Sequence, residues 1–210
     1  PFRLGLIGNT GTRTSDQRDV ADELIDEHDN AAFDDIVLLG NNIHGPRVFD
    51  HLEIKDSFEV PYHDLLRDGV SFHATLGHED QSYAWLQTRY PAFHMGGQRY
   101  YADTLGMGLV DLFVLDSERF VVGGVVDREQ FEWLERELAA STAPWKVVTL
   151  FRALLSDVAD ARVNATLAEA LLPLFDRYEV DIVAWASGEW YERLAPEGAG
   201  PIFLNLGWSG

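Results

Sequence analysis

The sequence contains no cysteine, and only two of its 16 basic residues are lysines, Lys55 and Lys146. Without cysteine the chain forms no disulfide and offers no thiolate ligand or nucleophile, so its redox compartment cannot be inferred. No apolar run reaches the ~20 residues that a transmembrane helix needs, and we expect none. We expect no signal peptide within this sequence, because Pro1 is followed at once by an apolar strand pattern. Any leader would have been removed before this numbering begins.

Positive charge is scarce. The chain has 35 Asp and Glu against 16 Lys and Arg, and its net charge is −19. This field repels nucleic acid and anionic membranes, and no basic stripe offsets it, so we do not expect a nucleic-acid partner. An Asp-rich, lysine-poor surface that stays hydrated in high salt fits a halophilic source. An acidic protein from an arginine-favouring genome explains the composition equally well.

The remaining composition is that of a globular protein, with 46% hydrophobic and 24% charged residues. The length of 210 residues is enough for one domain with a sizeable core. Apolar runs of strand length alternate with amphipathic segments of helical period. Strands are expected at 4–7, 36–39, 70–76, 100–101, 109–115, 145–150, 180–185 and 202–206. Helices are expected after Ser15, after Asp127 with Gln130 in a capping box, and over 166–178. We find no repeat or linker and predict one α/β domain over residues 1–210.

Three of these strands end in a glycine followed by a polar residue: Gly8-Asn9, Gly40-Asn41 and Gly77-His78. In open α/β sheets, ligands bind beyond the carboxyl ends of the strands. We therefore expect these loops to converge on one cleft, which would hold any functional site.

These strand-end segments, and others along the chain, follow the order and spacing of a known set of motifs. The segments are 8–11 (Gly-Asn-Thr-Gly), 39–44 (Leu-Gly-Asn-Asn-Ile-His), 76–80 (Leu-Gly-His-Glu-Asp), 90–95, 100–101, 113–117, 130–134, 143–148, 191–193 and 207–210. Together they resemble the calcineurin-like metallophosphoesterases, and the small purple-acid-phosphatase-like branch in particular. The resemblance implies a four-layer α/β/β/α sandwich of two mixed sheets, with helices outside.

The resemblance also implies two metal ions about 3.5–4 Å apart that polarise a phosphate and activate a water. In the first motif, Asn9 stands where the family has an Asp ligand. In the second, Asn41 takes the place of the bridging Asp and His44 that of the metal-bound tyrosine. In the third, His78 falls on the family's Asn ligand and Glu79 on its catalytic His. A one-residue deletion would instead keep His78 as the His and remove the Asn.

The second half of the implied site is altered further. Phe151, Arg152 and Ala153 stand where the family has His-His-Pro, which puts Phe151 at a ligand position and Arg152 at a catalytic one. Ser187 and Glu189 replace both histidines of the family's Gly-His-Asp-His. None of the seven histidines lies beyond residue 94, so the C-terminal half offers no imidazole. We predict that a normal dinuclear site cannot form.

The leading hypothesis is a pseudoenzyme that serves as a binding or structural subunit, with a protein partner or a second copy of itself and no cofactor. Random mutational drift would be expected to damage packing positions as well as ligand positions, because most substitutions destabilise a fold. Here the strand-end glycines and the helix cap are intact, which suggests that the fold itself is still needed. Deliberate replacement of Asp by Asn, or Asn assigned in place of Asp, would give the same pattern. Family resemblance makes secretion an expectation, and the sequence itself does not fix the compartment.

The alternative is an acid-phosphatase-like phosphoester hydrolase with a remodelled site for one zinc, manganese or iron ion. Its candidate ligands are His44, His78, Glu79, Asp80 and Glu189. More often, such polar loop residues are simply solvated. In addition, Asn9-Thr10-Gly11 would offer backbone N–H groups to a phosphate, with Thr10 and Gly11 as the loop. Of the aromatic residues Trp185, Trp190, Tyr191 and Trp208, we expect all but Trp190 in the core.

Overall fold

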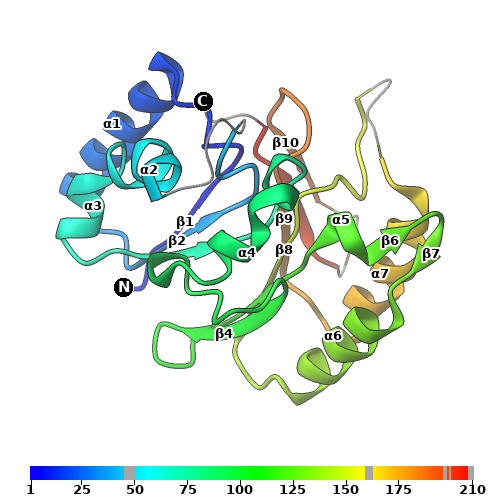
Figure 1. Ribbon diagram of the computed structural model, residues 1–210. Coiled ribbons are helices and arrows are strands. Elements are labelled where there is room, and N and C mark those ends of the chain that lie inside the picture. The colour runs from blue at the N-terminus through cyan, green and yellow to red at the C-terminus, as the bar shows by residue number, and fades with distance from the viewer. Residues whose placement is uncertain (45–50, 159–162, 196–197, 199, 208–210) are drawn as a thin grey trace.

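The computed structural model describes residues 1–44, 51–158, 163–195, 198 and 200–207. Two sheets lie face to face with helices on both outer sides, which gives four layers (Figure 1). This confirms the expected α/β/β/α sandwich. None of the helices in these ranges is both long enough and apolar enough to cross a membrane.

The smaller sheet has the order β1-β2-β3, and its three strands all run parallel. It is therefore not mixed, unlike the larger sheet. The strands are β1 (Leu4–Ile7), β2 (Asp35–Leu38) and β3 (Ser71–Ala74). Helices lie on its outer side (Figure 1): α1 (Ser15–Asn30), α2 (His51–Ile54), the π-helical turn Lys55–Glu59 and α3 (His63–Arg67).

The larger sheet has the order β10-β11-β9-β8-β5-β4, with antiparallel strands only at its two edges. Its strands are β4 (Tyr101–Leu105), β5 (Val110–Val114), β8 (Trp145–Thr149), β9 (Ile182–Trp185), β10 (Glu192–Leu194) and β11 (Ile202–Asn205). The long helices α6 (Arg128–Ala140) and α7 (Ala165–Arg177) cover its outer face. The connections contain α4 (Ala84–Gln87), α5 (Ser117–Phe120), the 3-10 turns Glu79–Tyr83 and Pro91–Phe93, and the hairpin of β6 (Val121–Val122) and β7 (Val125–Val126).

Two apolar cores lie on opposite faces of the larger sheet. Along β5, Leu112 and Val114 face the smaller sheet, whereas Phe113 between them packs with α6 and α7. This alternation follows from the two-residue period of a strand. Because both faces of the central strands are buried, those strands are continuous apolar runs, which is why the sequence locates them.

The eight strands expected from the sequence are all present, whereas β10, the β6–β7 hairpin and the helices between residues 51 and 67 were not anticipated.

Two details of the expected helix capping were wrong. Thr14, not Ser15, caps α1 by accepting a hydrogen bond from the Gln17 N–H. Asp127 caps α6 as expected, but the Gln130 side chain does not reach back to it. Its amide instead bonds the backbone N–H and C=O of Asp116, at 2.9 and 3.3 Å.

Candidate functional site

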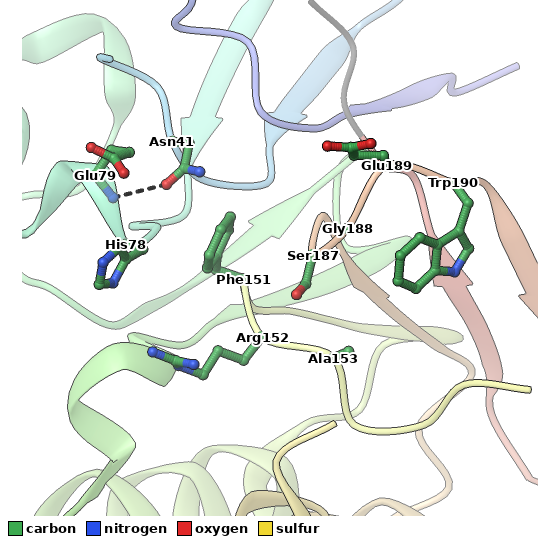
Figure 2. Close-up of a pocket in the computed structure, with 10 residues that line it drawn as sticks. All are labelled: Asn41, His78, Glu79, Phe151, Arg152, Ala153, Ser187, Gly188, Glu189 and Trp190. Carbon is green, nitrogen blue, oxygen red and sulfur yellow. Dashed lines mark hydrogen bonds between the residues drawn. The ribbon is translucent and has the colours of Figure 1, made fainter. Parts of the chain in front are cut away.

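A cleft of about 560 Å³ opens beyond the carboxyl ends of strands from both sheets (Figure 2). Its lining comes from the segments after β2, β3, β8 and β9. Of the three loops that the strand-end glycines predicted, those at Gly40 and Gly77 contribute, whereas the loop at Gly8 does not. The lining residues are Asn41, His78, Glu79, Phe151, Arg152, Ala153, Ser187, Gly188, Glu189 and Trp190. Five of the seven implied ligand positions thus meet in one cleft. Asn9 and His44 do not line it.

The side-chain oxygens of the two asparagines are already bonded within the protein. Both residues have left-handed backbone, with φ of 52° at Asn9 and 54° at Asn41, which asparagine tolerates better than most residues. Asn41 Oδ1 accepts a hydrogen bond from the Glu79 N–H at 2.9 Å. Asn9 is fully buried, and its Oδ1 lies 2.9 Å from Nε2 of His44. Asn9 and His44 therefore pair with each other and not with a shared ligand.

The ring of Phe151 lies in the middle of the cleft residues, between Asn41 and His78 on one side and Ser187 on the other (Figure 2). A Cβ added to Gly40 would come within 2.9 Å of this ring, so the ring packs directly on the backbone at the end of β2. The Ser117 hydroxyl accepts hydrogen bonds from the N–H groups of Phe151 and Arg152, at 3.2 and 3.1 Å. These bonds hold the turn that carries the ring.

Glu118 organises one end of the cleft, and the sequence analysis missed it. Its Oε2 accepts from Nδ1 of His78 at 3.1 Å and from Arg152 Nη2 at 2.8 Å. The Glu118 side chain is only 6% exposed, and its buried Oε1 accepts no hydrogen bond from the described part of the chain. Its position after β5 is a signal of the kind that identified Asn41 and His78. It was overlooked because no strand-end glycine precedes it.

Trp190 forms the opposite end of the cleft and is held in place by two contacts. Gly188 has φ of +99°, and a Cβ there would come within 2.5 Å of the indole ring, so only glycine allows this approach. The indole Nε1 donates to Glu192 at 3.4 Å. The expectation of a cleft position for Trp190 is met, and Trp185 is in the core. Tyr191 is 66% exposed, so its expected core position was wrong, and Trp208 lies outside the described residues.

No family model matches this sequence. Over 91 residues, 41% of the chain, it is 33% identical to two Mycobacterium tuberculosis proteins. These are the uncharacterized protein MT2654 of strain CDC 1551 / Oshkosh and the uncharacterized protein Rv2577 of strain ATCC 25618 / H37Rv. The match spans 17% of the length of each of these relatives.

Solved structures match nearly the whole chain. GAP50, described as the anchor in the inner membrane complex of Plasmodium, matches 99% of it with a TM-score of 0.84 and 20% identity, over 72% of its own length. A dimetal phosphatase from Danio rerio also matches 99%, with a TM-score of 0.73 and 14% identity, over 88% of its length. The purple acid phosphatase PPD1 from yellow lupin seeds matches 98%, with a TM-score of 0.72 and 15% identity, over 43% of its length. The chain has the calcineurin-like metallophosphoesterase fold.

Within this metallophosphoesterase fold, Asp80 does not project into the cleft, which corrects the sequence-based expectation. Its carboxylate is fully buried and accepts four hydrogen bonds: from the N–H groups of Asn42, Ile43 and Gly77 and from the Gln87 amide, at 2.7–3.2 Å. Burial raises the Asp80 pKa, and these four donors oppose that rise. Asp80 thus ties the loop after β2 to the loop after β3.

His44 is likewise held away from the cleft. Burial lowers its pKa; nearby Asp80 and Glu79 oppose this shift, and Arg13 adds to it. His44 is therefore mainly neutral at pH 7. Arg13 also donates to the His44 backbone carbonyl at 2.7 Å and pairs with Glu53 at 2.5 Å, which fixes this segment.

The expected phosphate loop is packed against its neighbour. The N–H of Asn9 donates to the Gly40 carbonyl at 3.1 Å, and that of Gly11 donates to the Asn41 carbonyl at 3.0 Å. A Cβ on Gly11 would lie 2.3 Å from the Asn42 backbone, so no space for an anion separates the two loops there. Thr10 is also buried. Asn9 and Gly11 therefore cannot offer these N–H groups to a phosphate, which corrects that expectation.

The donor set does not fit the two metal ions of the dimetal phosphatases. Two bound cations need anionic, bridging carboxylates, whereas Asn9 and Asn41 contribute neutral amides that are already engaged. Phe151 has no donor atom. Across the part of the chain that the structure describes, no group of three or more His, Asp or Glu side chains is placed to hold a metal ion.

Proposed function

We propose that this chain is a non-catalytic protein with the metallophosphoesterase fold, and that it acts as a binding or structural subunit. The observation that carries the proposal is the phenyl ring of Phe151 in the centre of the strand-end cleft. In the enzymes, this region must hold metal ions and phosphate oxygens. An apolar ring among hydrogen-bonded amides supplies neither ligand nor charge.

The similar structures agree with either kind of role. The same fold occurs in a dimetal phosphatase and in a protein described as an anchor. Fold alone therefore does not decide function, and the side chains of the cleft must. In this chain the strand-end geometry is kept and the metal-binding chemistry is replaced, which supports a role that needs the surface and not the reaction.

The competing function is phosphoester hydrolysis at a single zinc, manganese or iron ion. One observation favours it: His78, Glu79 and Glu189 all line the cleft. Against it, His78 already bonds Glu118, and two of the five ligands that the sequence suggested, His44 and Asp80, are directed elsewhere. We therefore rank the non-catalytic role first.

Metal content and turnover, measured on one preparation purified without chelator, test the choice. We expect well under one equivalent of transition metal by elemental mass spectrometry. We also expect no hydrolysis of bis-p-nitrophenyl phosphate above background when zinc, manganese or iron is added. One bound equivalent, with turnover lost in both His78→Ala and Glu189→Ala, would establish the single-metal hydrolase and overturn the proposal.

A structural subunit must also make a defined assembly. We expect light scattering after size exclusion to show either a discrete homo-oligomer or a stable complex with a partner, with an interface above about 1,000 Å². A chain that stays monomeric at all concentrations and is recovered from its source without a partner would contradict this role.

A further inference from the structure

We propose that the Trp190 end of the cleft binds a guanidinium or alkylammonium group. Such a group would come from an arginine or lysine of a partner protein, or from a small organic cation. The inference rests on the proposed binding role and names the chemistry of what is bound. It depends on a fixed aromatic ring, on the carboxylate of Glu189 beside it, and on the separation of Arg152 from both (Figure 2).

The indole of Trp190 is positioned before any ligand arrives. Gly188 packs against the ring, and Glu192 accepts from its Nε1. Glu192 is itself held by the Ser156 hydroxyl and the Asp157 N–H, both at 2.7 Å. A ring with so little remaining freedom loses little entropy on binding. A tryptophan face is also the strongest side-chain surface for a cation.

The carboxylates of the cleft are left without counterions. Glu79 and Glu189 are exposed and line the cleft, and neither side chain has a hydrogen bond or ion pair within the described residues. Figure 2 places Glu189 on the side of Trp190 and Glu79 on the opposite side, beside His78. A cation at the indole would therefore have Glu189 as its neighbouring carboxylate. Ser187, which lies between Phe151 and Trp190 in Figure 2, adds a hydroxyl that can accept a hydrogen bond from an N–H.

The one cationic side chain of the cleft is neutralised and directed elsewhere. Arg152 pairs with Glu118 at 2.8 Å, and Figure 2 shows its guanidinium directed away from Trp190. It therefore does not fill the space between Trp190 and Glu189. The Arg152–Glu118 pair carries no net charge, so the two unpaired carboxylates leave the cleft negative.

The net charge of the whole chain also favours binding of a cation in the cleft. A net charge of −19 raises the local concentration of cations and opposes the approach of anions. A phosphate, which the metal-binding enzymes accept, would meet uncompensated carboxylates here. A cation would meet a complementary site.

The test uses indole N–H signals in the NMR spectrum of the 15N-labelled protein, which has six tryptophans. Trp190→Phe assigns the Trp190 signal. The probes are acetyl-Gly-Arg-Gly-amide and methylguanidinium, each matched to a neutral analogue of the same shape, the citrulline peptide and methylurea. We expect a saturable shift of the Trp190 signal with the cations, and at least about tenfold weaker binding of the neutral analogues.

Three variants locate the site. Binding to the variants is measured by isothermal titration calorimetry with the arginine peptide, since Trp190→Ala and Trp190→Phe lack the reporter signal. We expect Trp190→Ala and Glu189→Gln each to weaken cation binding by about tenfold, with Trp190→Phe retaining most of it. The control is Glu129→Gln, which makes the same change of charge on exposed α6, away from the cleft, and should bind like wild type. If Trp190→Ala fails to fold, the comparison of Glu189→Gln with Glu129→Gln still decides the question.

The inference is overturned if neither cation gives a saturable shift, if the neutral analogues bind equally well, or if Glu189→Gln behaves like Glu129→Gln. Tighter binding of the arginine peptide than of methylguanidinium assigns the site to a partner's side chain, and equal binding assigns it to a small cation. The metal and turnover measurements are independent of these. Metal-dependent turnover would overturn the proposed function but not the cation site. If the protein shows neither turnover nor cation binding, the cation site is overturned and the proposed function is not.

Discussion

The side-chain oxygen of Asn41 accepts a hydrogen bond from the backbone N–H of Glu79 at 2.9 Å. The two residues lie in loops after neighbouring parallel strands, β2 and β3. By resemblance to the metallophosphoesterases, Asn41 stands where an aspartate would bridge two metal ions. Here the same position joins two loops.

Replacing Asn41 tests this structural role. We expect Asn41→Ala to lower the free energy of unfolding by about 2–3 kcal/mol, since it loses a hydrogen bond worth ~1 kcal/mol and replaces asparagine, which tolerates left-handed backbone, by alanine, which is strained there. Asn41→Gly loses the same bond without the backbone strain and should lose only about 1 kcal/mol. Urea denaturation measures both. Equal stabilities of the two variants would show that backbone conformation contributes nothing.

Asp80 should be among the most sensitive polar positions of the fold. In Asp80→Asn, an NH₂ group replaces an oxygen that now faces N–H donors, so at least one buried donor loses its acceptor. We expect a loss of about 2–4 kcal/mol by urea denaturation. The matched control is Asp68→Asn, at an exposed position after α3, with an expected change within about 0.5 kcal/mol. A change in Asp80→Asn as small as in the control would contradict the role of Asp80 in joining the loops.

His44 should make the protein less stable in mild acid. Its folded-state pKa lies below the unfolded value of 6.5, so the unfolded chain binds more protons in the interval between the two. The contribution of neutral His44 to the free energy of unfolding is complete above pH 6.5 and is lost as the pH falls through the folded-state pKa. His44→Gln cannot titrate, so its loss of stability on acidification should be smaller than that of wild type. The same measurement on His63→Gln, at an exposed site on α3, should follow wild type.

Restoring the ligands that the resemblance implies should restore metal binding. We expect the combined variant Asn9→Asp, Asn41→Asp, Phe151→His, Ser187→His and Glu189→His to bind a transition metal far more tightly than the unaltered chain. Phe151→His alone supplies an imidazole without the bridging carboxylate and should bind far less. Elemental mass spectrometry and isothermal titration with zinc compare the three proteins. Tight metal binding by the unaltered chain would show that its present side chains suffice.

The sequence determined where the main strands lie along the chain and that loops at their carboxyl ends form a cleft. The central strands of the larger sheet are buried on both faces, so they appear as apolar runs. In the smaller sheet, the glycines after the strands mark where the loops begin. It also determined that the C-terminal half supplies no imidazole, because that is a matter of residue type alone. The short edge strand β10 and the helices over residues 51–67 escaped because they are too short for a clear period.

Only the tertiary structure decided which polar groups the cleft receives. Asp80 and Glu79 are adjacent, yet one is buried against the β2 loop and the other lines the cleft. Glu118 reaches His78 across 40 residues, and the side chain of Gln130 bonds the backbone of Asp116 and not that of its helix cap. Loop side chains have no periodic direction, and their partners depend on how two sheets and their turns come together. Sequence patterns fix which face of a strand is buried, whereas the donors and acceptors of a loop are paired only when the chain is folded.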